Sequence, residues 1–122
     1  MTPRDLHPGD IVLIYGVPAR IERVDRTHLA TRRENDSLDL WSYQGEIEPL
    51  PIYDELAMKS VGFYKTSEGL NFRTGLGHVL VKNNLCKIQY GDGYAEKEVK
   101  SLSDVQQFYY EVIGLELKGL TV

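Results

Sequence analysis

Hydrophobic and polar positions in the first half of the chain repeat with a period of two, which is typical of β-strands with one buried face. The predicted strands cover residues 11–15, 19–24, 27–31, 38–43 and 45–50, with a turn at residues 16–18. The first of them, IVLIY, is a strongly strand-favouring run. Because closure of a small sheet removes its exposed edges, we expect residues 1–50 to form a curved antiparallel meander or a small barrel.

The second half combines a helix with a second set of strands. Residues 53–60 carry acids in the first turn and Lys59 in the last, as the helix dipole favours, and Gly62 follows as a C-cap. Asn83 and Asn84 predict a tight hairpin turn, since Asn tolerates the positive φ that such turns require. Further strands are predicted at residues 62–65, 70–73, 78–82 and 85–90, with a break at 91–93 and a short extension at 99–102.

The best-marked element is a helix near the end of the sequence. Ser103 and Gln106 have the spacing of a capping box, and Gly114 stands where the helix should end. Between them, apolar residues recur at helical spacing and form one face: Val105, Phe108, Tyr109, Val112 and Ile113. We expect this face to pack on the second sheet. The predicted fold is one α+β domain, with the meander or barrel at 1–50 and a helix-sheet-helix unit at 51–122.

Composition narrows the class of protein. The 122 residues are 42% hydrophobic and 26% charged, which is ordinary for a globular domain and too apolar for a disordered chain. The single cysteine, Cys86, has no partner in the chain and favours a reducing compartment. The first residues lack the basic and apolar regions of a signal peptide, and no apolar run reaches the ~20 residues of a membrane span. We therefore expect a cytoplasmic protein with no membrane partner.

The net charge of −4 disfavours general nucleic-acid binding, which needs a cationic face, but the charges are unevenly spread. Residues 34–55 contain several acids and neither Lys nor Arg, whereas the preceding segment is rich in arginine, including Arg20, Arg23, Arg32 and Arg33. These arginines either pair with the acidic stretch inside the molecule or form one basic docking face. The sequence leaves both interpretations open.

No group of residues predicts metal binding or catalysis. His7, His28 and His78 are scattered, Cys86 is alone, and no two of them have the spacing of a metal site. Cys86 and His78 flank one hairpin and are the single candidate pair of nucleophile and base, although both also suit framework positions. Because no cluster of titratable residues is visible, we predict that the protein is not an enzyme and uses no cofactor.

The candidate binding residues are aromatic side chains and arginines. Trp, Tyr and Arg dominate protein interfaces, and they also stack on nucleic-acid bases. The predicted binding residues are Arg32, Arg33, Trp41, Tyr43, Tyr90 and Tyr94, with Tyr110 as a further aromatic of this kind. An alternative interpretation is that Trp41 and Tyr43 simply alternate along their strand, one pointing inward and one outward.

Three segments of the chain resemble the hallmarks of one family. They are residues 5–12 (DLHPGDIV), 46–63 (EIEPLPIYDELAMKSVGF) and 99–117 (VKSLSDVQQFYYEVIGLEL). The family consists of small uncharacterised proteins of Bacteroidota, their phages and mobile elements, with a "PIPLTeewLlkfGF" centre and a "VHqLQNLYFaLTGeEL" C-terminus. The resemblance implies a mobile-element context but no activity. This chain has Asp10 where the family has Asn, Ser103 where it often has His, and Gln107 where it has Asn.

The sequence therefore favours a non-catalytic accessory protein of the phage or mobile-element type, which acts by binding a protein partner or a second copy of itself. Two alternatives belong to other classes. One is nucleic-acid binding through a face that carries Arg20, Arg23, Arg32 and Arg33. The other is a nucleotide-signal sponge that counters host defence with a pocket lined by aromatic side chains and arginine.

Overall fold

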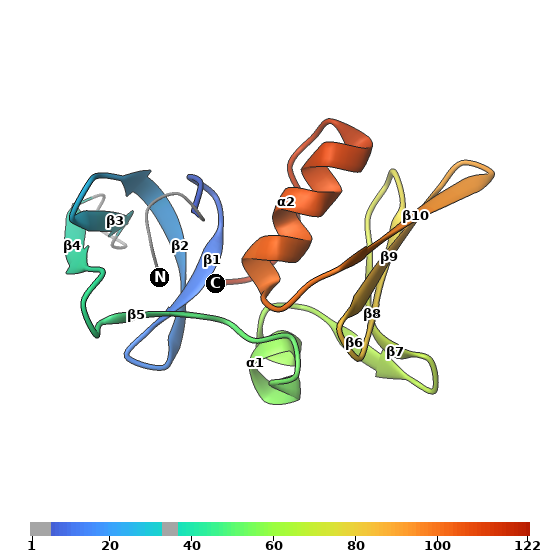
Figure 1. Ribbon diagram of the computed structural model, residues 1–122, viewed down its shortest axis with the longest axis horizontal. Helices are drawn as coiled ribbons and strands as arrows, with labels where there is room; N and C mark the ends of the chain where they lie inside the picture. The colour runs from blue at the N-terminus through green and yellow to red at the C-terminus, as the bar shows by residue number, and fades with distance from the viewer. Residues whose placement is uncertain (1–5, 33–36) are drawn as a thin grey trace.

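The computed structural model describes residues 6–32 and 37–122 and shows an α+β fold, as the sequence predicts. Two five-stranded antiparallel sheets stand at opposite ends of the molecule, and the C-terminal helix lies between them (Figure 1). The last residues return from this helix to the middle of the molecule, near strand β1 (Ile11–Ile14). One helix and one terminal segment therefore occupy the junction of the two sheets.

The first sheet comes from the N-terminal half and has the strand order β4-β3-β2-β1-β5. Its strands after β1 are β2 (Val17–Val24), β3 (His28–Arg32), β4 (Leu38–Ser42) and β5 (Ile47–Pro49). β2 pairs with β1 through its first half and with β3 through its second half. A register irregularity between Ile21 and Arg23 separates the two halves, and irregularities of this kind bend a strand. Strands β1 to β4 form an antiparallel meander, as expected for residues 1–50, whereas β5 pairs with β1 at the other edge of the sheet.

The turn between β1 and β2 is tighter than predicted. Tyr15 and Gly16 form it with φ values of +48° and +79°. Val17 and Pro18 therefore belong to β2 and not to the turn predicted at residues 16–18. Proline is tolerated here because it stands at the beginning of the strand.

The second sheet is a meander of consecutive strands in the order β10-β9-β8-β7-β6. They are β6 (Tyr64–Thr66), β7 (Gly69–Arg73), β8 (His78–Lys82), β9 (Leu85–Tyr90) and β10 (Gly93–Glu98). Asn83 has a φ of +56° in the turn between β8 and β9, which confirms the predicted tight hairpin. Residues 91 and 92 form a turn, in agreement with the predicted break, but β10 begins at Gly93 and was not predicted, and residues 99–102 form no strand. The sequence of β10, GYAEKE, shows no apolar alternation because it is an exposed edge strand, in which Ala95 packs against the core.

Helix α1 (Glu55–Ser60) is shorter than the helix predicted at residues 53–60. Asp54 is its N-cap, and the Asp54 carboxylate accepts a hydrogen bond of 3.1 Å from a backbone N–H of the first turn. The C-cap is Val61 and not Gly62. Gly62 follows with a φ of +118°, a conformation that larger residues rarely adopt.

Helix α2 (Leu102–Ile113) begins two residues earlier than predicted, because its capping box is Ser101 and Asp104 and not Ser103 and Gln106. The Ser101 hydroxyl accepts from the Asp104 N–H, and the Asp104 carboxylate accepts from the Ser101 N–H. The predicted apolar face packs on the second sheet, and Gly114 ends the helix with a φ of +84°, both as predicted. Gln106 therefore lies inside the helix.

The two sheets enclose two clusters of buried side chains. The large core combines the second sheet with both helices and the C-terminal segment, whereas the small core lies within the first sheet. β1 belongs to both, since Ile11 and Leu13 enter the large core while Val12 and Ile14 enter the small core. All four are buried, because successive side chains of a strand point to opposite faces. β1 is the wall that the two cores share.

Candidate functional site

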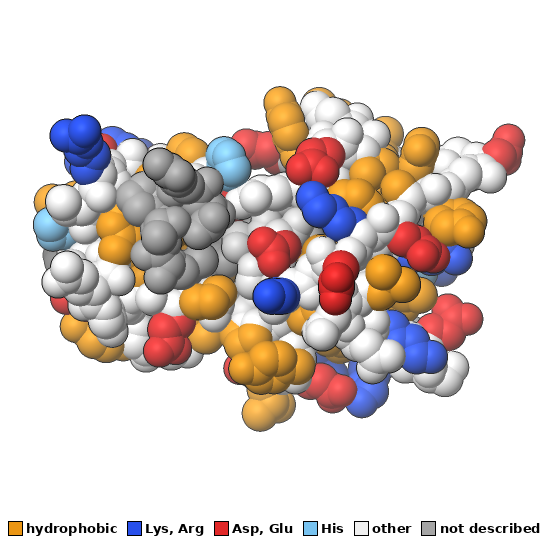
Figure 2. Space-filling view, in the orientation of Figure 1, with side chains coloured by type: hydrophobic (Ala, Val, Ile, Leu, Met, Phe, Trp, Pro, Cys, Tyr) orange, Lys and Arg blue, Asp and Glu red, His pale blue; other side chains and the backbone are white. Residues whose placement is uncertain are grey.

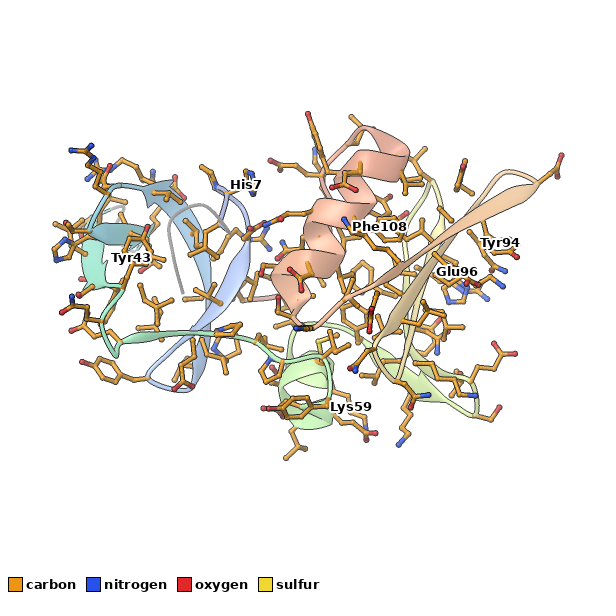
Figure 3. The ribbon with its side chains drawn as sticks, in the orientation of Figure 1. His7, Tyr43, Lys59, Tyr94, Glu96 and Phe108 are labelled. Carbon is orange, nitrogen blue, oxygen red and sulfur yellow. The ribbon has the colours of Figure 1, made fainter. Side chains whose placement is uncertain are left out.

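The predicted aromatic binding residues do not lie together. Trp41 and Tyr43 are two positions apart in the first sheet, and both pack against the small core instead of pointing one inward and one outward. The Trp41 indole N–H donates to Thr31 Oγ1 at 2.9 Å, and the Tyr43 hydroxyl donates to the Asp25 carbonyl at 3.1 Å. Tyr43 and Tyr94 stand at opposite ends of the molecule (Figure 3). These residues do not form one aromatic surface.

Tyr90 and Tyr94 lie on the second sheet and are exposed. Lys87 Nζ is 4.3 Å from the centre of the Tyr94 ring, which is a cation–π contact between neighbouring strands. Tyr90 is 40% exposed and Tyr94 is 59% exposed, so both remain available to a partner. Their position on the second sheet separates them from the aromatic pair of the first sheet.

Two of the predicted basic residues have carboxylate partners. Arg32 Nη2 lies 2.6 Å from Glu22 Oε1, and Arg23 Nε lies 3.1 Å from Asp25 Oδ2. Both carboxylates belong to β2 or the turn after it, outside the acidic stretch that the sequence suggested. These pairs neutralise part of the predicted basic face. Arg33 lies outside the described residues.

Cys86 and His78 do not face each other. In the register of β8 and β9, Cys86 is opposite Val81, whereas His78 is opposite Gln89 at the other end of the hairpin. Burial raises the pKa of the Cys86 thiol to about 12, which keeps it protonated and unreactive. His78 Nε2 is instead hydrogen-bonded to Asn71 Oδ1 at 2.8 Å. Both residues serve the framework of the second sheet.

A concave site lies at the junction of the two sheets, and we call it the junction pocket. Its volume is about 480 Å³. Its lining comes from the turn at residues 7–10, from Arg20 on β2, from α2, and from Glu116 and Leu117 after the helix. His7 lies in the turn before β1, on the side of the first sheet that faces α2 (Figure 3). A pocket where polar groups converge from distant segments is the first candidate for a binding site.

Two adjacent glutamines of α2 hold the turn against the helix. The Ile11 N–H donates to Gln106 Oε1 at 2.7 Å, and Gln106 Nε2 donates to the Gly9 carbonyl at 2.9 Å. Gln107 Nε2 donates to Asp10 Oδ2 at 2.8 Å. Gln106 is buried, so it satisfies two backbone groups at a place where an unpaired group is costly. The wall of the pocket is thus fixed by bonds between residues 95 to 97 positions apart.

Asp10 is the buried acid of the junction pocket, and only 6% of its side chain is exposed. Besides the bond from Gln107, Asp10 Oδ2 accepts a hydrogen bond of 3.0 Å from the His7 N–H, and His7 Nδ1 lies 3.8 Å away. Burial raises the pKa of the Asp10 carboxyl above its usual value, and the bond from Gln107 opposes this rise. Burial therefore favours the neutral form of the Asp10 carboxyl group, whereas its hydrogen bonds favour the charged form.

The rim of the pocket carries more acid than base. Glu116 is exposed and makes no hydrogen bond or ion pair with any described residue. Its carboxylate lies beside Gly9, since Oε1 is 3.6 Å from the position that a Cβ atom would occupy on that glycine. Glu111 is also exposed and pairs with a lysine of β10 at 3.4 Å. Arg20 donates to the carbonyl of Leu120 at 2.9 Å. Acidic side chains are visible along the outer surface of α2 in Figure 2.

Apart from Arg20 and Tyr110, the residues of the junction pocket were not among the binding residues expected from the sequence. One usable signal is Gln106, which lies four positions after Leu102 and three before Tyr109 on an otherwise apolar helix face. A polar side chain at such a position needs a buried partner. This signal does not say which segment supplies the partner, because helical and strand periods describe only local structure.

No protein-family model, curated protein or solved structure matches this chain. Within residues 6–32 and 37–122, no three His, Cys, Asp or Glu side chains stand together as a possible metal site. In the same part of the chain, no helix is long and apolar enough to cross a membrane.

Proposed function

We propose that this protein is a non-catalytic binding protein and that its junction pocket binds a positively charged group of a protein partner. The observation that carries the proposal is the carboxylate of Glu116, which lies on the pocket rim without a partner among the described residues. Glu111 and the buried Asp10 add further acid to the same lining. A guanidinium or ammonium group entering the pocket would form a charge-assisted hydrogen bond with the Glu116 carboxylate.

The state of the reactive side chains supports a binding function better than a catalytic one. The Cys86 thiol is buried, its pKa is raised to about 12, and His78 faces a different residue. In the junction pocket, Asp10 Oδ2 is already engaged by Gln107 and by the His7 N–H. The described residues that line the pocket include no Ser, Thr or Cys nucleophile. The resemblance noted above suggests that such a protein serves a phage or mobile element.

The two alternative functions both require an anionic ligand. Nucleic acids and nucleotides carry phosphate groups, which the acids of the junction pocket would repel. Arg23 and Arg32 are paired with carboxylates, so the first sheet offers less positive charge than its sequence suggests. Arg20 lines the pocket but donates to a backbone carbonyl. These observations favour a cationic ligand over either alternative.

A titration followed by amide NMR tests the proposal with two probes of nearly identical shape. N-acetyl-arginine amide carries the charged guanidinium, whereas N-acetyl-citrulline amide replaces it with a neutral urea. We expect the arginine probe to shift the amide signals of Gly9, Gln107 and Glu116, and we expect weaker or no shifts with the citrulline probe. Because exposed charges are screened by salt, the shifts should shrink as the ionic strength rises.

Two variants test whether N-acetyl-arginine amide binds at the junction pocket. Glu116→Gln removes the unpartnered carboxylate and should raise the Kd of the arginine probe by about fivefold, corresponding to about 1 kcal/mol for one exposed charge. Glu96→Gln is the matched control, since Glu96 is an exposed acid on β10, far from the pocket (Figure 3). Equal binding of both probes, or equal losses in both variants, would rule out recognition of charge in the junction pocket.

A further inference from the structure

A second depression adjoins the junction pocket at the C-terminal end of α2. Its volume is about 520 Å³, and its lining includes Leu76, Tyr110 and Leu115. These three side chains are 55%, 57% and 56% exposed, so a hydrophobic patch gathers around this depression. Tyr110 and Glu116 line both depressions, which makes the two spaces neighbours with a common wall. We call the second one the apolar depression.

The walls of the apolar depression are fixed by hydrogen bonds. Thr74 Oγ1 accepts from the N–H groups of Leu76 and Gly77 at 3.2 and 2.9 Å and is 2.8 Å from the Tyr109 hydroxyl. This network ties the loop between β7 and β8 to α2. On the other side, Gly114 ends the helix in the left-handed conformation and turns the chain back along it. A preformed wall lowers the conformational cost of binding.

We propose that the junction pocket and the apolar depression form one groove, which binds a segment of a protein partner that carries an arginine or lysine next to a large apolar residue. This inference rests on the function proposed above and adds the second half of the recognition element. The acids Asp10, Glu111 and Glu116 line the junction pocket and suit the basic residue. Exposed leucine and tyrosine side chains suit the apolar residue, because hydrophobic patches on a surface mark interaction sites.

The charged residues at the two ends of the groove also indicate the direction in which the partner segment lies. Lys118 lines the apolar depression but not the junction pocket. Because Glu116 and Lys118 both line the apolar depression, it lacks the excess of acid found in the junction pocket, and we expect the basic residue of the partner in the junction pocket. The common wall of Tyr110 and Glu116 means that the basic and apolar residues are adjacent or separated by one residue, since neighbouring Cα atoms are only about 3.8 Å apart.

Four short peptides test the groove, all acetylated and amidated. The first two are Gly-Arg-Leu-Gly and Gly-Arg-Ser-Leu-Gly, and each is compared with the same peptide in which serine replaces leucine. We expect at least one of the leucine peptides to bind about tenfold more tightly than its serine partner, because the leucine side chain leaves water. Leu115→Ser or Leu76→Ser should remove that gain and leave binding of N-acetyl-arginine amide unchanged.

The control variant is Leu56→Ser, which changes an exposed leucine on α1, away from the groove. Hydrophobic side chains also gather over α1 in Figure 2, so this control tests a rival surface. The inference would be overturned if Leu56→Ser abolished the tighter binding of the leucine peptides while Leu115→Ser and Leu76→Ser left it unchanged. Equal affinities of the leucine and serine peptides would also overturn the inference, but the proposed function would still hold if N-acetyl-arginine amide bound. If N-acetyl-arginine amide did not bind, both the inference and the proposed function would be rejected.

Discussion

The large core and the small core of this protein differ in size and in what covers them. Among the described residues, 20 buried side chains form the large core and 6 form the small core. The large core is closed by two helices and the C-terminal segment, whereas the small core is enclosed by one curved sheet. Because hydrophobic burial dominates stability, we expect the second sheet with its helices to be the more stable half of the molecule.

The junction pocket lies where the two cores meet. The two halves are joined by the apolar side chains of β1 and by the hydrogen bonds of Gln106 and Gln107. Both glutamines also line the pocket, so the residues that join the halves form part of its wall.

The two cores should differ most in the free energy of unfolding that is lost when one buried leucine in each is replaced by alanine. Leu102 lies in the large core and Leu29 in the small core, and both are fully buried. Leu102→Ala should lower the free energy of unfolding by an amount near the upper end of about 2–5 kcal/mol, because dense surroundings collapse little around a cavity. Leu29→Ala should fall near the lower end, because a single curved sheet relaxes more easily. Urea denaturation measures both values, and a reversed order would refute the distinction.

The next largest effect should come from the polar bond between the halves. Gln106→Leu keeps a similar volume but leaves the Ile11 N–H and the Gly9 carbonyl without their partner. It should lower the free energy of unfolding by about 1–3 kcal/mol and accelerate hydrogen exchange of the Ile11 amide. The matched control is Gln89→Leu at an exposed position of β9, where a change within about 0.5 kcal/mol is expected. Unchanged protection of the Ile11 amide would show that Gln106 does not join the halves.

A smaller effect should distinguish the observed start of α2 from the predicted one. Ser101→Ala removes the N-cap acceptor and should cost about 1 kcal/mol of the free energy of unfolding. Ser103→Ala should cost less, because among the described residues the Ser103 hydroxyl bonds only to the Ser101 hydroxyl, at 3.0 Å. Thermal unfolding of the two variants compares them directly. A larger loss in Ser103→Ala would support the capping position expected from the sequence.

The comparison also shows which features a sequence can reveal. The apolar face of α2 and the turn at Asn83 were predictable because each depends on local periodicity or on one backbone conformation. β10 was not, because an exposed edge strand needs no apolar alternation. The capping box was misplaced by two residues because serines stand at 101 and 103, and the choice between them depends on where the preceding chain leaves the sheet.

The candidate site was harder to predict than the fold. The aromatic residues expected to bind are the right type for an interface, but Trp41 and Tyr43 pack against the small core while Tyr90 and Tyr94 lie on the other sheet. The junction pocket depends on contacts between β1, α2 and the C-terminal segment. Such contacts follow from the packing of whole elements, which the pattern of a single chain does not specify.

The measurement that tests this account most directly is the stability and binding of the Asp10→Asn variant. Burial raises the pKa of Asp10 in the folded protein, so the folded state holds this proton more tightly than the unfolded state. The free energy of unfolding of the native protein should therefore fall as the pH rises from 3.8 through the folded pKa. An amide is neutral and can still accept the bonds from Gln107 and the His7 N–H.

We predict that Asp10→Asn is more stable than the native protein at pH 7, loses this part of the pH dependence, and binds N-acetyl-arginine amide more weakly. Asp92→Asn, a change in the exposed turn before β10, should alter none of these. Urea denaturation at several pH values and the NMR titration provide the readouts. A variant that is less stable at pH 7 and binds the probe as tightly as the native protein would contradict the claim that the junction keeps a buried acid for binding.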